Sequence, residues 1–267
     1  MFPLLIKNFK LNYKKKIFYL DSKKKTLKKT MLDSIPILEK IIEINPKLVF
    51  LSDDNALRTL GPPLVQYGVK IVSLGINGNP RTYFNANDFF SVYGVLERPL
   101  FVRGIVEINR IVGYRHNILI LFDDSETSKS IIESIFQNKT TKEILKFRIK
   151  YQIVRNLNEI KMKINSIDKK NTHLFLGPLH TIKRSAKNLD VMNYQEVLGK
   201  ISSYYKSHYY SFWKDYIIPN GAKISYGVDL VDHSSISLDI AYKIINNTAP
   251  KLRFVTPENG RIFKLDK

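Results

Sequence analysis

The chain has 267 residues, enough for two domains of ordinary size or one large one, and 44% of them are hydrophobic and 25% charged. This composition excludes a disordered chain, and no apolar run approaches the ~20 residues that are needed to cross a bilayer. The formal net charge is +19, and the absence of cysteine excludes disulfides, thiolate metal sites and cysteine nucleophiles.

The N-terminal segment is the most basic part of the chain. Residues 1–30 hold ten lysines and a single acid, Asp21. Such a surface attracts phosphate backbones or anionic lipid surfaces, because binding releases counterions. The simpler interpretation is that the chain uses lysine wherever a side chain faces water, and we favour it over nucleic-acid binding.

In chain order, the first half predicts three strands and two helices. Apolar runs indicate strands, and apolar residues at helical spacing indicate helices. The strands are predicted at 17–20, 48–51 and 69–77, and the helices at 26–45 and 55–60. Pro36 interrupts the first helix or begins its second half, because proline lacks the amide donor and suits a first turn.

The second half continues the alternation. Strands are predicted at 118–122, 146–154, 172–179 and 221–230, and helices around 131–135, at 157–168 and at 234–247. Strand, polar turn and helix in repetition indicate right-handed βαβ units with a mostly parallel sheet, and the continuous apolar runs are typical of buried parallel strands. The predicted fold class is α/β.

Three polar clusters follow predicted strands: SDDNA (52–56), GIN (75–77) and DDSETS (123–128). In open parallel sheets, ligands bind at the carboxyl ends of the strands, where helix N-termini point. The first and third clusters are alike, since each has two aspartates between a strand and a helix. This repetition predicts two similar lobes that each contribute one cluster to a shared cleft.

The aspartate pairs have two other interpretations. Asp53 and Asp54 could bind Mg²⁺, but a phosphoryl-transfer site needs a third aspartate or a lysine at another strand end, where this chain has Asn77 and Gly177. Aspartate and serine also cap helices. Capping by one aspartate of each pair is expected, but it leaves the second carboxylate of each pair unexplained.

Catalysis has little support in the sequence. The five histidines lack metal-ligand spacing, and no nucleophile elbow or glycine-rich phosphate loop is present. We therefore expect no enzymatic activity, no cofactor and no metal. The aromatic stretch 203–216 could stack nucleic-acid bases, or it could pack a helix against a lobe, and we favour packing.

Four stretches resemble one family: PKLVFLSDDNALRTLGPPLVQYGVKIVSLGINGNP, VYGVLERP, ILILFDDSETS and SFWKDYIIPNGAKISYGVDLVDHSSISLDIAYKIINNTAP. They are similar to the substrate-binding proteins of ABC transporters, in the branch related to aromatic-amino-acid binders. The resemblance covers roughly residues 17–263. It implies the type I periplasmic-binding fold, in which two Rossmann-like α/β lobes with mostly parallel sheets hold a ligand between them.

The resemblance also implies domain boundaries and a truncation. The first lobe is expected to comprise residues 1–95 and 218–248, and the second 96–217 and 249–267. Residues 17–31 resemble the family's second strand and the turn after it, so the first strand–helix unit and an export signal are expected to be missing. Loss of a central strand would expose two strand edges and leave the first lobe incomplete.

The expected function is to bind a small polar, amino-acid-like solute by hinge closure and deliver it to an ABC transporter permease. Carboxylates suit the ligand's ammonium group, while Ser128 and helix amides suit its carboxylate. Glu97 and Trp213 lie near the crossovers, so each either touches ligand or braces the hinge. The expected ligand-binding residues are Asp53, Asp54, Asn55, Asn77, Glu97, Asp124, Ser125, Ser128 and Trp213.

The expected protein is a monomer with no transmembrane segment and no nucleic-acid partner. The resemblance implies a periplasmic or extracytoplasmic location, or a cytoplasmic one if this start is genuine. Two alternatives stay open: a ligand-sensing module of the same fold, and a basic cytoplasmic nucleic-acid-binding protein.

Overall fold

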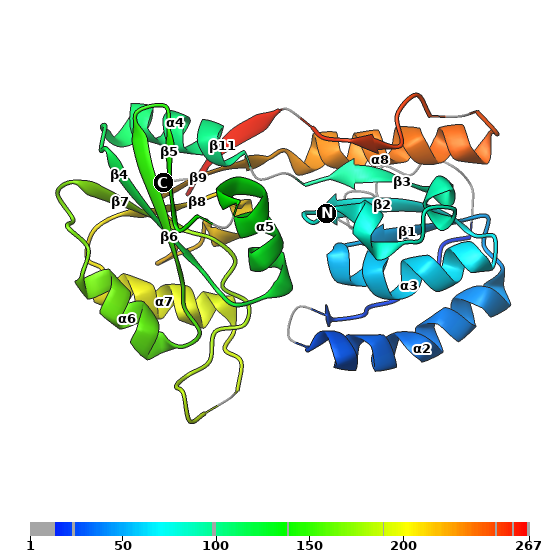
Figure 1. Ribbon diagram of the computed structural model, residues 1–267, viewed down its shortest axis with the longest axis horizontal. Coiled ribbons are helices and arrows are strands. Elements are labelled where there is room, and N and C mark those ends of the chain that lie inside the picture. The colour runs from blue at the N-terminus through cyan, green and yellow to red at the C-terminus, as the bar shows by residue number, and fades with distance from the viewer. Residues whose placement is uncertain are drawn as a thin grey trace. The chain divides into compact units, whose positions relative to one another are not determined.

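A computed structural model describes residues 14–22, 25–97, 100–137, 139–188, 190–248, 250–257 and 259–265. The chain divides into two compact units: Met1–Arg98 with Val228–Asn259, and Pro99–Gly227 with Gly260–Lys267. Each unit has its own sheet with helices packed on it (Figure 1), which confirms the predicted α/β class. No helix within the described ranges is long and apolar enough to cross a membrane.

The first unit is built on a four-stranded parallel sheet in the order β1-β2-β3-β10. Its strands are β1 Leu48–Ser52, β2 Lys70–Ile76, β3 Val92–Leu96 and β10 Phe254–Val255. Its helices are α2 Leu27–Ile44, α3 Asp54–Gln66 and α8 Leu230–Ile245, with short 3-10 turns η2 Pro80–Tyr83 and η3 Asp88–Ser91. Successive residues of β2 point to opposite faces, so Ile71 packs with α2 and α3 while Val72 packs with α8. Figure 1 shows α3 and α8 on opposite sides of this sheet.

The second unit is built on a seven-stranded sheet in the order β11-β9-β8-β7-β4-β6-β5. Its strands are β4 Asn117–Phe122, β5 Thr141–Ile144, β6 Phe147–Ile153, β7 Thr172–Leu176, β8 Tyr209–Ser211, β9 Ile224–Val228 and β11 Gly260–Lys264. Its helices are α4 Phe101–Val112, α5 Glu126–Phe136, α6 Leu157–Asn165 and α7 Tyr194–Tyr204, with the 3-10 turn η4 Lys214–Tyr216. The pairings among β4, β6, β7, β8 and β9 are parallel, whereas β5 pairs antiparallel with β6.

Two predicted elements differ from the observed ones. Residues 17–20 form no strand, and Phe18 and Leu20 instead pack on the apolar cluster under α2 and α3. Helix α3 continues six residues beyond the predicted end at Leu60 and contains two prolines. Burial of Leu64 on the core side offsets the backbone hydrogen bonds that the prolines remove. The observed elements that were not predicted are β3, β5, β8, β10, β11, α4 and α7.

The domain boundaries also differ from the expected ones. Strand β9 lies in the segment 218–248 expected for the first lobe, yet it pairs with β8 of the second sheet. Strand β10 lies in the expected second-lobe tail, yet it pairs with β3 of the first sheet. Ile224 and Tyr226 of β9 join the apolar cluster that contains Tyr210 and Phe212, and this shared burial decides the sheet to which β9 belongs.

The aromatic stretch 203–216 packs the second unit. Tyr205, Tyr209, Tyr210 and Phe212 are all at least 97% buried. Their rings line both apolar clusters of the unit, on either side of its sheet. These four rings are therefore not open to stacking by bases, and the packing interpretation is confirmed for them.

A fully buried histidine joins α8 to the first sheet. The amide of Gly75 donates a hydrogen bond to His233 Nε2 at 3.2 Å. Gly75 has φ +72 where the pairing of β2 with β3 shifts register, so this amide takes a side-chain partner. Burial lowers the pKa of His233 to about 4, which keeps the ring neutral and able to accept at ordinary pH.

Acid should destabilise the protein through His233. An unfolded histidine has a pKa of about 6.5. As pH falls from 6.5 towards the folded pKa of about 4, the unfolded state binds a proton first, so stability falls by about 3 kcal/mol in total. His233→Gln retains an acceptor oxygen for Gly75 and should flatten this part of the pH profile, measured by urea unfolding at several pH values.

The matched control for this prediction is His208→Gln, because His208 is exposed. This variant should keep the pH profile of the original chain. A His233→Gln profile as steep as that of the control would contradict the assignment.

Candidate functional site

Asp54 holds the loop that follows β2. The Asp54 carboxylate is buried at the start of α3, and its Oδ2 accepts from the Asn77 amide at 2.9 Å. Its Oδ1 accepts from the Gly78 amide at 3.0 Å and from the Tyr83 hydroxyl at 2.8 Å. Both carboxylate oxygens therefore have partners within the unit, and Asp54 fixes the shape of the strand-end loop.

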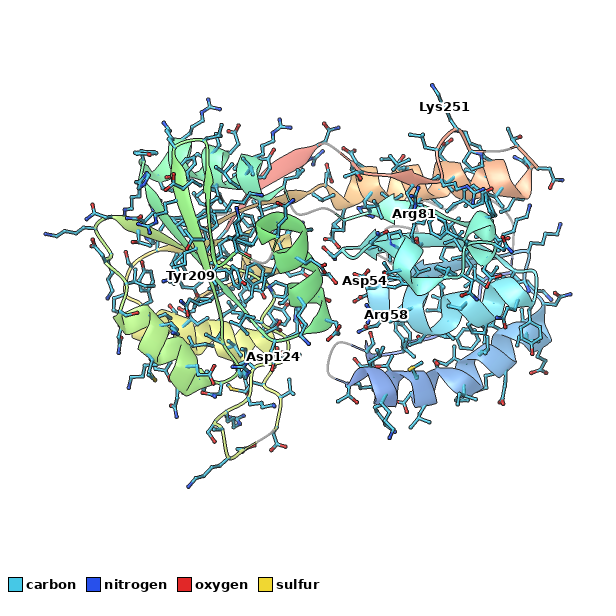
Figure 2. All side chains as sticks on the ribbon, viewed as in Figure 1. Asp54, Arg58, Arg81, Asp124, Tyr209 and Lys251 are labelled. Carbon is cyan, nitrogen blue, oxygen red and sulfur yellow. The ribbon has the colours of Figure 1, made fainter. Side chains whose placement is uncertain are left out.

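The same loop requires glycine and a protonated tyrosine. A Cβ at position 78 would lie 2.1 Å from the Tyr83 hydroxyl and 3.1 Å from Asp54 Oδ1, so only glycine fits at Gly78. Burial and the Asp54 charge raise the pKa of Tyr83, which keeps its hydroxyl a donor. The guanidinium of Arg58 lies 4.7 Å from the centre of the Tyr83 ring. Figure 2 labels Asp54 and Arg58, which lie one turn apart on α3.

Asp53 precedes this buried carboxylate and occupies an unusual backbone conformation. Its φ of 86° and ψ of 150° fall in a region that residues with a side chain rarely adopt, at a cost of about 1–3 kcal/mol. Its Oδ1 accepts from the Asn55 amide at 3.4 Å, and its own amide donates to the Leu74 carbonyl at 2.9 Å. Asp53 therefore caps α3 at the end of β1, and the residue is only partly buried.

Asp123 plays the corresponding internal role in the second unit. This fully buried residue follows β4, and its Oδ1 accepts from the Ser125 amide at 3.2 Å and from the Ser125 and Ser128 hydroxyls at 2.5 Å each. Its Oδ2 accepts from the amides of His180 and Thr181 at 2.7 and 3.0 Å. Asp123 thus joins the end of β4 to the loop after β7.

Two serines that were predicted to bind ligand form hydrogen bonds within the second unit instead. Ser125 caps α5, where its hydroxyl accepts from the Ser128 amide at 3.2 Å while donating to Asp123. Ser128 is fully buried, and its hydroxyl donates to Asp123. Ser128 therefore has no exposed surface through which it could contact the carboxylate of a ligand, contrary to the expectation from the sequence. Sequence reasoning missed the role of Asp123, whose signal was the serine pair two and five residues later.

Asp124 presents its carboxylate at the strand-end edge of the second unit. Its Oδ1 accepts from the Thr181 hydroxyl at 3.1 Å, and its Oδ2 lies 3.6 Å from Nε of Arg155. The Asp124 side chain is 36% exposed and that of Arg155 is 58% exposed. Figure 2 labels Asp124. A carboxylate, a hydroxyl and a guanidinium therefore lie together at this edge, and the carboxylate and guanidinium are partly exposed.

The remaining predicted residues separate into the two units. Parallel pairing brings the ends of β1, β2 and β3 to one edge of the sheet. Asn77 and Glu97 therefore lie at the same edge as Asp53. Asn77 is buried, and the Glu97 amide donates to the Ile76 carbonyl at 2.8 Å. Trp213 lies in the second unit, where its ring stands edge-on to the rings of Phe101 and Phe212.

Metal chemistry gains no support at either edge. Within the described residues, no group of three or more histidine, aspartate or glutamate side chains could hold a metal ion. Asp54 and Asp123 accept hydrogen bonds at both oxygens from protein donors. Each aspartate pair therefore has one buried member that braces a loop and one member that is partly exposed.

Solved structures share the fold of this chain. An ABC domain in complex with L-Trp from Streptococcus pneumoniae matches with a TM-score of 0.55 at 12% identity, covering 87% of this chain and 77% of that chain. A ligand-free, open substrate-binding protein with adhesive properties from Clostridium difficile matches at 0.52 and 13%, covering 87% and 75%. A conserved domain protein from Vibrio cholerae matches at 0.51 and 11%, covering 88% and 76%.

At these identities the likeness shows the fold, which is periplasmic-binding-protein-like as predicted. No family model matches the sequence, and no curated protein matches it. The branch of the family and the truncation of the first lobe stay predictions.

The two aspartates of each pair should respond differently to the same substitution. Asp54→Asn and Asp123→Asn place an amide NH₂ group against backbone donors and should each cost about 2–4 kcal/mol of unfolding free energy. The neighbours Asp53→Asn and Asp124→Asn are the matched controls and should cost less than about 1 kcal/mol. Urea unfolding measures all four, and equal losses within a pair would refute the division.

Relief of backbone strain at Asp53 should stabilise the chain. Asp53→Gly removes about 1–3 kcal/mol of strain and loses only a few tenths by weakening the cap, against up to about 1 kcal/mol of added unfolded-chain entropy. We expect unchanged or higher thermal stability. The control is Asn193→Gly, which removes the exposed cap of α7 at an ordinary φ of −64° and should destabilise. A loss at Asp53 as large as that at Asn193 would argue against strain.

Proposed function

We propose that the chain is a solute-binding protein that takes a small polar solute at the strand ends of its two α/β units. One observation carries this proposal: each unit buries one aspartate of its pair and leaves the neighbouring aspartate partly exposed. The inner residues are Asp54 and Asp123, and the outer ones are Asp53 and Asp124. Ligands of open parallel sheets bind at this edge, and the shared fold with solved substrate-binding structures supports the proposal.

The proposed ligand is an amino acid or a similar zwitterion. Asp53 and Asp124 suit an ammonium group, because hydrogen bonds between opposite charges are about twice as strong as neutral ones. Arg155 and Thr181 beside Asp124 suit a carboxylate. A solved structure of the same fold contains L-Trp, which supports this ligand class.

We further propose that the bound solute is delivered to an ABC transporter permease outside the cytoplasm. The chain passes between its two units three times, after Arg98, Gly227 and Asn259. Such crossovers suit a protein that closes on its ligand by hinge motion. Closure on the ligand and delivery to the permease are proposed as one function.

Thermal-shift measurements against the amino acids test the proposal. Unfolding temperature should rise with the logarithm of the concentration of at least one of them, because the ligand binds the folded state alone. Asp53→Asn and Asp124→Asn should each raise the dissociation constant of that ligand about tenfold or more, because each loses a charge-assisted hydrogen bond worth about 1.5–3 kcal/mol.

The matched control is Asp239→Asn, because Asp239 is an exposed residue of α8 far along the chain from both edges. This variant should bind as the original chain does. A folded protein whose unfolding temperature responds to no amino acid would defeat the proposed ligand class.

A further inference from the structure

The N-terminal half of helix α2 turns two polar side chains towards the core and three apolar ones towards solvent, whereas Ile41 in its C-terminal half packs in the core. Thr30 and Ser34 are 0% and 5% exposed, and their hydroxyls donate to backbone carbonyls of the preceding turn. Met31, Leu32 and Ile35 are 53%, 55% and 50% exposed. Water-exposed apolar side chains in one cluster indicate a surface that is covered by a partner.

The exposed apolar residues share one face of the helix. Met31 and Leu32 lie four and three residues before Ile35, and Lys28 lies three and four residues before them, which are the spacings of helix neighbours. Lys28, Met31, Leu32 and Ile35 are named here the outer face of α2. Figure 1 shows α2 beyond α3 at the rim of its unit, on the side away from the sheet.

Lysines gather at the N-terminal end of this face and in the segment before the helix. Lys14, Lys16 and Lys28 are exposed and belong to the basic N-terminal segment. The acid Asp33 is already paired with Lys25 and Lys29, each at 2.9 Å. The outer face of α2 is therefore apolar, with basic residues at its N-terminal end and the exposed acid Glu39 one turn beyond Ile35.

Two residues before the helix are also exposed and apolar or amphipathic, and they too lie among lysines in the sequence. Tyr19 is 84% exposed and Ile17 is 38% exposed, within a segment that also carries the lysines. Tyrosine prefers the boundary between water and acyl chains, where its ring is apolar and its hydroxyl is hydrated. The segment and the helix therefore offer one kind of surface.

Among three possible partners, only one uses both parts of this surface. A nucleic acid would neutralise the lysines but leave Met31, Leu32 and Ile35 in water. A second copy of the chain would cover the apolar residues but leave the lysines of the preceding segment without an anionic partner. An anionic bilayer binds lysine at its headgroups and takes apolar side chains at the acyl boundary. We propose that the outer face of α2, with residues 14–19, docks on an anionic lipid bilayer.

Sedimentation with sucrose-loaded vesicles tests the docking of the full chain. Vesicles of phosphatidylcholine with about 30% phosphatidylglycerol should pellet the protein at about 0.1 M salt, and pure phosphatidylcholine should not. Raising the salt to about 0.5 M should weaken binding about tenfold or more, because screening removes the lysine contribution.

Two sets of substitutions separate the apolar and charged contributions. The apolar set should lower vesicle partition about a hundredfold, at about fivefold for each half-exposed side chain that becomes buried. The lysine set should lower it about fivefold for each lysine. The apolar set is Met31→Gln, Leu32→Gln and Ile35→Gln; the lysine set is Lys14→Gln, Lys16→Gln and Lys28→Gln.

Matched controls come from exposed positions of the second unit. Met162→Gln with Ile111→Gln changes apolar residues that are 70% and 45% exposed on other helices. Lys169→Gln with Lys170→Gln changes two exposed lysines. All variants alter exposed side chains, so circular dichroism should show the original fold, and both control pairs should bind vesicles like the original chain.

Three results would overturn the proposal. One is an equal loss of vesicle binding in the control pairs and the α2 sets, or no vesicle binding at all by the folded chain. Another is binding to polyuridylate that needs the lysine set but not the apolar set, which would assign a nucleic-acid partner. The third is self-association that the apolar set abolishes, which would assign a second copy of the chain. The solute-binding variants Asp53→Asn and Asp124→Asn should leave vesicle binding unchanged.

Discussion

The structure depends on two buried carboxylates at the ends of parallel strands. Asp54 accepts three hydrogen bonds that join α3 to the loop after β2. Asp123 accepts five, of which three come from Ser125 and Ser128 and two join the end of β4 to the loop after β7. A buried charge is tolerated only when its oxygens are fully hydrogen-bonded, because desolvation otherwise costs several kcal/mol. These hydrogen bonds therefore explain both why the loops adopt one shape and why Gly78 must be glycine.

The braced loops hold the neighbouring aspartates in place. Asp53 keeps a strained backbone conformation because α3 follows at once and Leu74 accepts its amide hydrogen bond. Asp124 lies between Thr181 and Arg155, which limit its rotamers. Groups that are already oriented lose less entropy when they bind a ligand, so in the proposed site the inner carboxylates would contribute to affinity without touching the solute.

The structure narrows the choice of partner for the basic N-terminal segment, which its composition alone left open. Lysine counts by themselves fit nucleic acids, lipids or simple solvation. The exposed Met31, Leu32 and Ile35 beside the lysines restrict the choice, since a bilayer is the partner that uses charge and apolar area together. A protein that binds solute with one set of residues and lipid with another would keep its cargo close to the membrane.

The sequence by itself determined the α/β class, the principal buried strands such as β1, β2, β4 and β7, and which polar clusters lie at strand ends. Apolar runs such as 48–51, and capping residues such as Asp53 and Ser125, act over a few neighbours, so their pattern can be read locally. Tertiary structure alone decided which aspartate of each pair is buried, because the donors to Asp54 lie 23 to 29 residues away and those to Asp123 from the loop after β7 lie 57 and 58 residues away. It also decided that residues 17–20 form no strand and that β9 joins the second sheet, because a strand exists only where another strand supplies its hydrogen bonds.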